Sequence, residues 1–175
     1  MVRMTTLHVP FGGWTFDDLP QDVDFSYELV DGSLLVTPPA DPRHDRAAMR
    51  LSRLLPLGDD WDVLVDSGVY FDERNYRRPD VMICRRAAID HGRVTAADVL
   101  LAVEVMSPGS IATDRIAKPA QYAAAGIAYF WRIEPDAFVQ HALDDGVYRE
   151  VARHSDEVVV RKPVTLAFRL TELWD

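Results

Sequence analysis

The stretch VLLAVEVM, residues 99–106, decides how the rest of the chain is interpreted. Apolar side chains occupy both alternating sets of positions, which is typical of a strand covered on both faces. Glu104 interrupts this run, and a buried carboxylate needs a cation, a metal ion or a dense set of hydrogen bonds. The alternative is a glutamate at the end of a strand that reaches solvent. We expect a central strand that carries a functional acid at position 104.

A second acidic residue, Asp80, follows Pro79 and precedes the apolar residues VMIC. Proline is compatible with the first residue of a strand or with the turn that leads into it, so Asp80 is expected at the mouth of a strand. If residues 79–84 and 99–106 form adjacent strands, the carboxylates of Asp80 and Glu104 lie close enough to share one ion. Such carboxylates are hard ligands suited to Mg²⁺ or Mn²⁺. Taken alone, Asp80 would be a surface turn aspartate.

A third element follows in residues 111–125, where a helix is expected to end at Gly126. Asp114, Lys118 and Tyr122 are spaced four residues apart and share one face of a continuous helix. Pro119 disfavours helical geometry at Lys118, so the helix either kinks or begins there. In both cases the long side chain of Lys118 could reach the mouth of the sheet. The alternative is an exposed Asp114–Lys118 pair, which contributes only a few tenths of a kcal/mol.

The flanking segments predict a chain rich in strands. FSYELV and SLLVT flank Asp31-Gly32, a strong turn signal, so residues 25–37 are expected to form a β-hairpin. A helix is expected over about residues 43–57. Further strands are expected at residues 61–66, 69–72, 127–133, 137–143, 147–153, 157–161 and 164–170. The pattern predicts an α/β fold (an α+β mixed sheet) with helices on the sheet faces and a C-terminal β-meander, in a single domain over residues 1–175.

Composition indicates the cellular compartment and the kinds of partner that we expect for this chain. The 175 residues include one cysteine, Cys84, so no intrachain disulfide is possible and a reducing compartment fits best. The chain begins without a secretory signal pattern, and no apolar run approaches the roughly 18–20 residues that span a bilayer. We therefore expect a cytoplasmic protein without a membrane partner. The net charge of -9 is unusual for a protein that holds nucleic acid, so such a substrate would require local arginines and divalent cations.

The order of these residues resembles the Uma-two family of predicted endonucleases. That family belongs to the restriction-endonuclease-like superfamily, whose motif is Pro-Asp…(Asp/Glu)-X-Lys. The matching residues are Pro79-Asp80, Glu104-Val105-Met106-Ser107-Pro108, Asp114, Lys118, Tyr122, Gly126-Ile127, Tyr129 and Trp131. The upstream YELVDG, Tyr27 to Gly32, and the proline-rich stretch before His44 also resemble the family. The likeness extends from about Trp14 to the C-terminal strands.

The resemblance implies a restriction-endonuclease-like core in which Asp80 and Glu104 bind Mg²⁺ or Mn²⁺. The lysine of the motif is absent, because Met106 stands at its position. Lys118 matches a lysine that has moved to the following helix in this family, so the expected catalytic residues are Asp80, Glu104 and Lys118. The implied activity is Mg²⁺-dependent hydrolysis of phosphodiester bonds in nucleic acid, with DNA as the first candidate. Glu28 matches a family glutamate at the edge of the site, and Asp114 is a second candidate for that edge.

Three arginines are candidates for contacts with backbone phosphates: Arg77, Arg78 and Arg115. Two alternatives remain open. The chain could be a weakly active or inactive member of the fold that serves as a binding or assembly module, and it could form a homo-oligomer. It could also be a metal-dependent hydrolase of a smaller phosphoester, which suits its acidic charge. The histidines lack zinc-ligand spacing, and the sequence contains neither a phosphate-binding glycine loop nor a Gly-X-Ser-X-Gly elbow.

Overall fold

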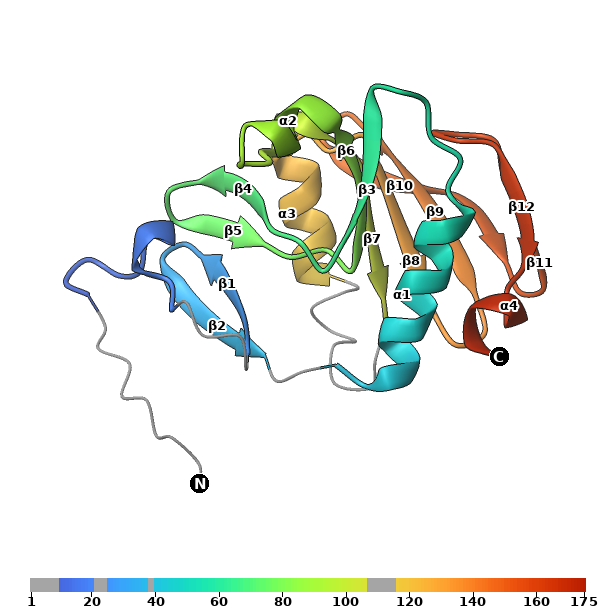
Figure 1. The fold of residues 1–175 in the computed structure, drawn as a ribbon, viewed down its shortest axis with the longest axis horizontal. Helices are drawn as coiled ribbons and strands as arrows, with labels where there is room; N and C mark the ends of the chain where they lie inside the picture. The colour runs from blue at the N-terminus through green and yellow to red at the C-terminus, as the bar shows by residue number, and fades with distance from the viewer. Residues whose placement is uncertain (1–9, 21–24, 38–39, 107–115) are drawn as a thin grey trace.

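A six-stranded mixed sheet forms the centre of the protein, which is described by a computed structural model over residues 10–20, 25–37, 40–106 and 116–175. Its strands lie in the order β10-β9-β8-β7-β6-β3 (Figure 1). They are β3 (Trp61–Val65), β6 (Val81–Arg85), β7 (Val99–Val105), β8 (Tyr129–Ile133), β9 (Phe138–Asp144) and β10 (Val147–His154). Only the β7–β8 pair is parallel within this sheet. The predicted mixed sheet is confirmed.

Strand β7 is covered on both faces, as its apolar pattern predicts. Leu101, Val103 and Val105 pack in a core cluster with helix α1 (Pro42–Leu54). Ala102 points to the opposite face and packs with Tyr122 of helix α3 (Lys118–Ala124). Figure 1 shows the two helices on opposite sides of the sheet. Alternation along the strand therefore directs Glu104 towards the α3 face.

Strands β6 and β7 are adjacent and antiparallel, with Val81 opposite Val103. The predicted adjacency of the segments that carry Asp80 and Glu104 is thereby confirmed. One further step along this register places Asp80 across from Glu104, at the end of β6 where the chain enters the sheet. Helix α3 begins at Lys118 and is preceded by π-helical geometry at Ile116 and Ala117, so Pro119 lies where the helical geometry changes. Proline fits the first turn because its missing N–H would have no partner there.

A four-stranded antiparallel sheet in the order β2-β1-β5-β4 lies beside α3 (Figure 1). Its strands are β1 (Ser26–Val30), β2 (Ser33–Thr37), β4 (Val69–Asp72) and β5 (Asn75–Arg77). The predicted hairpin is confirmed, and Asp31 and Gly32 both adopt positive φ angles in its two-residue turn, of 49° and 77°. Segment η1 (Phe16–Asp18) packs on one face of this sheet, over Tyr27, Leu29 and Tyr76.

The C-terminal strands form two separate units. Strands β8, β9 and β10 make the expected meander, but β11 (Glu157–Val160) and β12 (Leu166–Arg169) pair with each other in a sheet of their own. Helix α4 (Thr171–Trp174) lies against α1. The remaining elements are the short helix α2 (Arg86–Asp90) and η2 (Ala96–Asp98). No helix in the described part of the chain is long and apolar enough to cross a membrane.

Candidate active site

Glu104 is buried at the end of β7, with 1% of its surface exposed, and both of its carboxylate oxygens accept hydrogen bonds. Lys118 Nζ donates to Oε2 at 2.6 Å, and the Tyr122 hydroxyl donates to Oε1 at 2.6 Å. Lys118 and Tyr122 lie four residues apart on α3, so one face of the helix supplies both donors. The structure places Lys118 beside Glu104, one of the two carboxylates next to which the displaced-lysine interpretation puts it. A catalytic role for Lys118 stays a prediction.

Tyr122 is a hydrogen-bond donor to this carboxylate. Burial raises the pKa of its hydroxyl well above 10, and the charges of Glu104 and Glu28 raise it further. The phenol therefore keeps its proton at neutral pH and can donate a hydrogen bond to Glu104. The ring also packs edge-on against Phe71 and beside Phe130, which fixes the position of the hydroxyl.

Glu28 and Arg77 extend the cluster from the four-stranded sheet. Arg77 is 2% exposed, and its Nη1 donates to Glu28 Oε2 at 3.0 Å while its Nε donates to Gln121 Oε1 at 2.7 Å. The other carboxylate oxygen of Glu28 accepts from the Arg78 backbone N–H at 2.9 Å and lies 3.9 Å from Lys118 Nζ. Glu28 is thus a buried member of the cluster that reaches it from the neighbouring sheet, and its place at the edge of the site stays a prediction. Lys118 lies within ion-pair distance of both Glu28 and Glu104.

Asp80 is held at the junction of α1, β6 and β7. Its Oδ2 accepts from the Val105 backbone N–H at 2.6 Å and lies 3.1 Å from His44 Nε2. Its side chain is 17% exposed. The chain turns into β6 here, and the Asp80 carbonyl accepts from the Asp66 N–H at 3.0 Å. These contacts fix the orientation of the carboxylate at the mouth of the strand.

His44 is a site residue that the sequence analysis did not select as a candidate. It lies in the first turn of α1, and only the proline-rich stretch leading to it drew attention to this region. Burial lowers its pKa, but the hydrogen bond and charge of Asp80, together with those of Asp45, outweigh burial and raise the pKa to about 9. His44 is therefore protonated at neutral pH and forms an ion pair with Asp80.

Because of this ion pair, we expect the free energy of unfolding to fall as pH rises in metal-free buffer. The pKa of His44 rises on folding from 6.5 to about 9, so its contribution is complete below pH 6.5 and is lost as pH rises through about 9. We expect a loss of about 1–3 kcal/mol over this window after screening by solvent. Urea unfolding at several pH values measures it. His44→Gln should flatten the decline, and the same decline in that variant would contradict the assignment.

The carboxylates suit a hard divalent cation by their chemistry. Mg²⁺ is commonly bound through one or two protein carboxylates, with waters and substrate phosphates completing its shell. Asp80 and Glu104 offer such oxygens across adjacent strands, and Oδ1 of Asp80 accepts no hydrogen bond from the described residues. Residues 10–20, 25–37, 40–106 and 116–175 contain no group of three or more His, Cys, Asp or Glu side chains that could hold an ion. A metal here would compete with Lys118 and His44 for the carboxylates.

The three arginines selected from the sequence have different surroundings. Arg77 is buried and its donors are directed at Glu28 and Gln121, which argues against the direct phosphate contact expected for it. Arg78 has a side chain that is 28% exposed and forms an ion pair with Asp66 at 2.9 Å. Arg115 and the site-edge candidate Asp114 lie outside the described residues. Of the two candidates that the structure describes, Arg78 is therefore the one that a substrate could reach.

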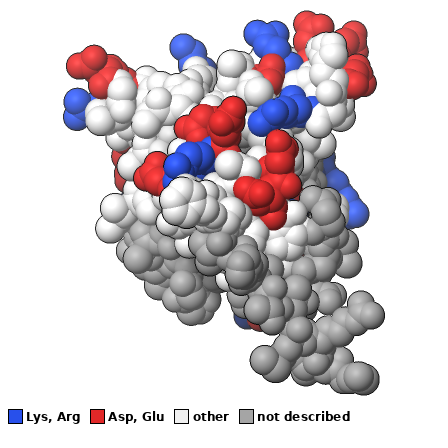
Figure 2. Space-filling view, turned by 90° about the vertical axis from the view of Figure 1, so that its left-hand side faces the viewer, with Lys and Arg blue, Asp and Glu red and all other residues white. Residues whose placement is uncertain are grey.

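The surface next to the four-stranded sheet carries charges of both signs. Figure 2 shows acidic and basic side chains interspersed there, with no continuous basic area on the described part of this face. This agrees with the net charge of -9. Long-range attraction to a phosphate backbone is consequently weak on this face.

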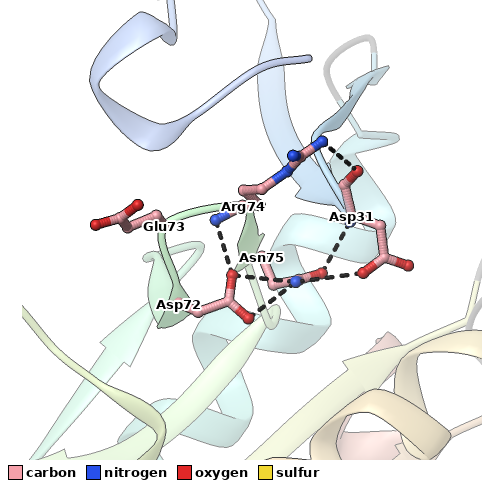
Figure 3. A pocket seen from close by; sticks show the side chains of 5 residues that line it. All are labelled: Asp31, Asp72, Glu73, Arg74 and Asn75. Carbon is pink, nitrogen blue, oxygen red and sulfur yellow. Dashed lines mark hydrogen bonds between the residues drawn. The ribbon is translucent and has the colours of Figure 1, made fainter. Parts of the chain in front are cut away.

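A hollow lies away from this cluster, where the turns of two hairpins meet (Figure 3). Its volume is about 610 Å³, and it is lined by Asp31, Asp72, Glu73, Arg74 and Asn75. The Asn75 amide donates to Asp72 at 3.0 Å, and its oxygen accepts from the Asp31 N–H at 2.9 Å. These hydrogen bonds tie the β1–β2 turn to the β4–β5 turn. None of the candidate site residues lines this hollow.

Comparison with known proteins agrees with this architecture. The chain matches the family model of Uma2, described as "Putative restriction endonuclease", over residues 15–171. Among solved structures it is similar to "a putative nuclease belonging to DUF820 from Anabaena variabilis ATCC 29413", with a TM-score of 0.67, 15% identity and coverage of 91% of this chain and 97% of that chain. No curated protein matches the chain. The family match spans most of the sequence, which confirms the resemblance, and the chain belongs to the Uma2 family.

Proposed function

We propose that this chain is a nuclease that hydrolyses phosphodiester bonds of nucleic acid, DNA in the first instance, with the help of Mg²⁺ or Mn²⁺ in the cytoplasm. The observation that carries the proposal is the contact of Lys118 with Glu104, 2.6 Å apart, next to the strand that begins after Asp80. Membership of the Uma2 family, described as "Putative restriction endonuclease", and the fold shared with a chain described as "a putative nuclease" support the same activity. Two acids on adjacent strands, Asp80 before β6 and Glu104 near the end of β7, with a lysine bound to Glu104, make an arrangement suited to phosphodiester hydrolysis.

Each residue of the cluster has a separate task in this proposal. The carboxylates of Asp80 and Glu104 would hold the cation, which supplies Lewis-acid activation of water and of the phosphoryl group. The Val105 N–H and His44 orient Asp80, and Tyr122 orients Glu104. The Lys118 ammonium would position the attacking water or stabilise negative charge on the phosphoryl oxygens. Glu28 and Arg77 support Lys118 from the neighbouring sheet.

The experiment that tests the proposal incubates the purified chain with plasmid, single-stranded DNA and RNA, with and without Mg²⁺ or Mn²⁺. We expect cleavage that requires the metal and disappears in Asp80→Asn, because the amide loses the charge that attracts the cation. Asp59→Asn is a matched control, since Asp59 is an exposed acid outside the cluster. Metal-independent cleavage, or the same cleavage in both variants, would contradict the assignment of the site.

Metal binding should also be measurable without a substrate. Millimolar Mg²⁺ or Mn²⁺ should raise the thermal midpoint by linkage, since a cation that binds only the folded chain stabilises it. For a chain of this size, each kcal/mol of binding free energy raises the midpoint by about 2–4 °C. The shift should be lost in Asp80→Asn and kept in Asp59→Asn. An unchanged midpoint in the parent chain would favour an inactive member of the family that acts as a binding module.

The acidic charge favours a second candidate, a metal-dependent hydrolase of a smaller phosphoester. A chain with a net charge of -9 repels a long polyanion more than it repels a compound with one phosphate. Hydrolysis of bis-(p-nitrophenyl) phosphate, together with intact plasmid and oligonucleotides in the same buffer, would support this candidate over the nuclease.

A further inference from the structure

We propose that the chain binds one unpaired nucleobase of its substrate in an aromatic hollow of the four-stranded sheet, on the face opposite the active-site cluster. The hollow has a volume of about 200 Å³, and its walls include the side chains of Phe16, Phe25, Tyr27, Tyr76 and Arg78. This inference rests on the proposed nuclease function and adds the class of substrate: nucleic acid that is single-stranded or locally unpaired. In a duplex, both faces of each base are already stacked.

The walls of the hollow are rigid on one side and open on the other. Phe16, Tyr70 and Tyr76 form a packed group of rings whose centroids lie 4.3 to 5.2 Å apart. Tyr27 and Tyr76 are 7% and 9% exposed, so they are fixed in the core of the small sheet. Phe25 is 46% exposed, so a flat ligand can reach part of its side chain. Such a platform suits stacking, which does not depend on base identity.

The position of the hollow connects it to the cluster. Tyr27 and Tyr76 line the hollow, while their chain neighbours Glu28 and Arg77 point to the opposite face of the same strands and join the cluster. Arg78 takes part in both, because its side chain lines the hollow and its N–H donates to Glu28. Asp80 lies two residues further along the chain, within about 7 Å between Cα atoms. A strand of nucleic acid could therefore reach both places.

Charge and size favour a nucleobase over other flat ligands. Arg78 lines the hollow and also pairs with Asp66, and the Arg93 guanidinium lies 5.8 Å from the ring of Phe16, a wall residue, so two cations lie at or near the hollow. The volume lies below the roughly 300 Å³ at which pockets for drug-sized ligands begin, which fits a single ring system. With a net charge of -9, the chain has weak general attraction for phosphates. Stacking of a base supplies affinity that does not depend on the charge of the protein.

The test measures binding separately from cleavage. A labelled single strand of mixed sequence and the matching blunt duplex are titrated with the chain in EDTA, by fluorescence polarisation, with a gel to check that the strands stay intact. Phe25→Ala should weaken single-strand binding about 5- to 100-fold, the range for loss of one stacked base. Binding to the duplex should not change. Phe25→Trp should bind the single strand about as tightly as the parent chain does. Phe25→Leu, which is apolar but cannot stack, should bind it as weakly as Phe25→Ala.

Met49→Ala is the matched control, because Met49 is 45% exposed and lies on α1, away from the hollow. It should leave both affinities unchanged. The subsite is overturned if the parent chain does not bind the single strand, if Phe25→Ala binds it normally, or if Phe25→Leu binds as well as Phe25→Trp. If the chain proved not to be a nuclease, an effect of the Phe25 substitutions on single-strand binding would still stand. Conversely, metal-dependent cleavage with a silent Phe25→Ala would preserve the nuclease and remove the subsite.

Discussion

Lys118→Met is expected to lower metal-dependent cleavage by at least about 100-fold, the usual effect of removing one group that stabilises charge in a transition state. Its Nζ lies 2.6 Å from Glu104 Oε2 and 3.9 Å from Glu28 Oε1, so the substitution removes a positive charge that two buried carboxylates share. Initial rates on a labelled oligonucleotide measure the loss. Lys162→Met is the matched control, since Lys162 is the other lysine of the chain and is exposed. It should cleave at the parent rate.

The same substitution should also destabilise the fold, which the sequence alone did not suggest. From the sequence, Lys118 is expected to serve the reaction and to contribute little to folding. The structure buries it against Glu104, and removal of one partner of a buried ion pair costs about 3–5 kcal/mol. Rates must therefore be compared at a temperature where circular dichroism shows each variant to be folded.

Lys118→Arg separates the two contributions. Arginine keeps the positive charge that Glu104 needs, so most of the stability should remain. Its guanidinium is a planar fork and cannot reproduce a compact ammonium, so cleavage should stay low. Full activity in Lys118→Arg would mean that the residue only neutralises Glu104. Full activity in a folded Lys118→Met would refute the displaced-lysine interpretation.

Much of the fold follows from patterns within single segments. The apolar run around Glu104 predicts a strand buried on both faces, and Asp31-Gly32 predicts the hairpin turn, because each depends on local geometry. Strand β5 and helix α2 were not predicted. They contain three and five residues, too few for either the strand or the helix period to appear in the sequence. They are held by neighbouring elements instead.

The site was only partly predictable for a different reason. Asp80 and Glu104 were found because each stands out from its own surroundings, and Lys118 because a family pattern drew attention to it. His44 contacts Asp80 only because α1 packs across the end of β6, a tertiary relation that no local pattern records. Arg77 and Arg78 look alike in the sequence, yet one is buried and the other is partly exposed. Arg77 is the last residue of β5, whereas Arg78 lies just beyond the strand.

That difference between the two arginines predicts a large difference in stability. Arg77→Met should lower the free energy of unfolding by about 3–5 kcal/mol, because Glu28 then keeps a buried charge without its main partner. Arg78→Met should cost about 0–1 kcal/mol from its ion pair, since Asp66 is largely exposed and the Arg78 N–H that binds Glu28 is retained. Urea unfolding of both variants at neutral pH measures the two values.

A second substitution identifies the cause of the Arg77 effect. In the Arg77→Met background, Glu28→Gln removes the unpaired charge, so it should recover part of the lost stability. The same Glu28→Gln change in the parent chain should be destabilising, because it weakens the bond to Arg77. If Glu28→Gln were destabilising in both backgrounds, or if Arg77→Met and Arg78→Met cost the same, the charge of Glu28 would not be what Arg77 compensates. Arg77 would then stabilise the fold mainly by packing beneath Gln121, and Lys118 would be the principal partner of both carboxylates.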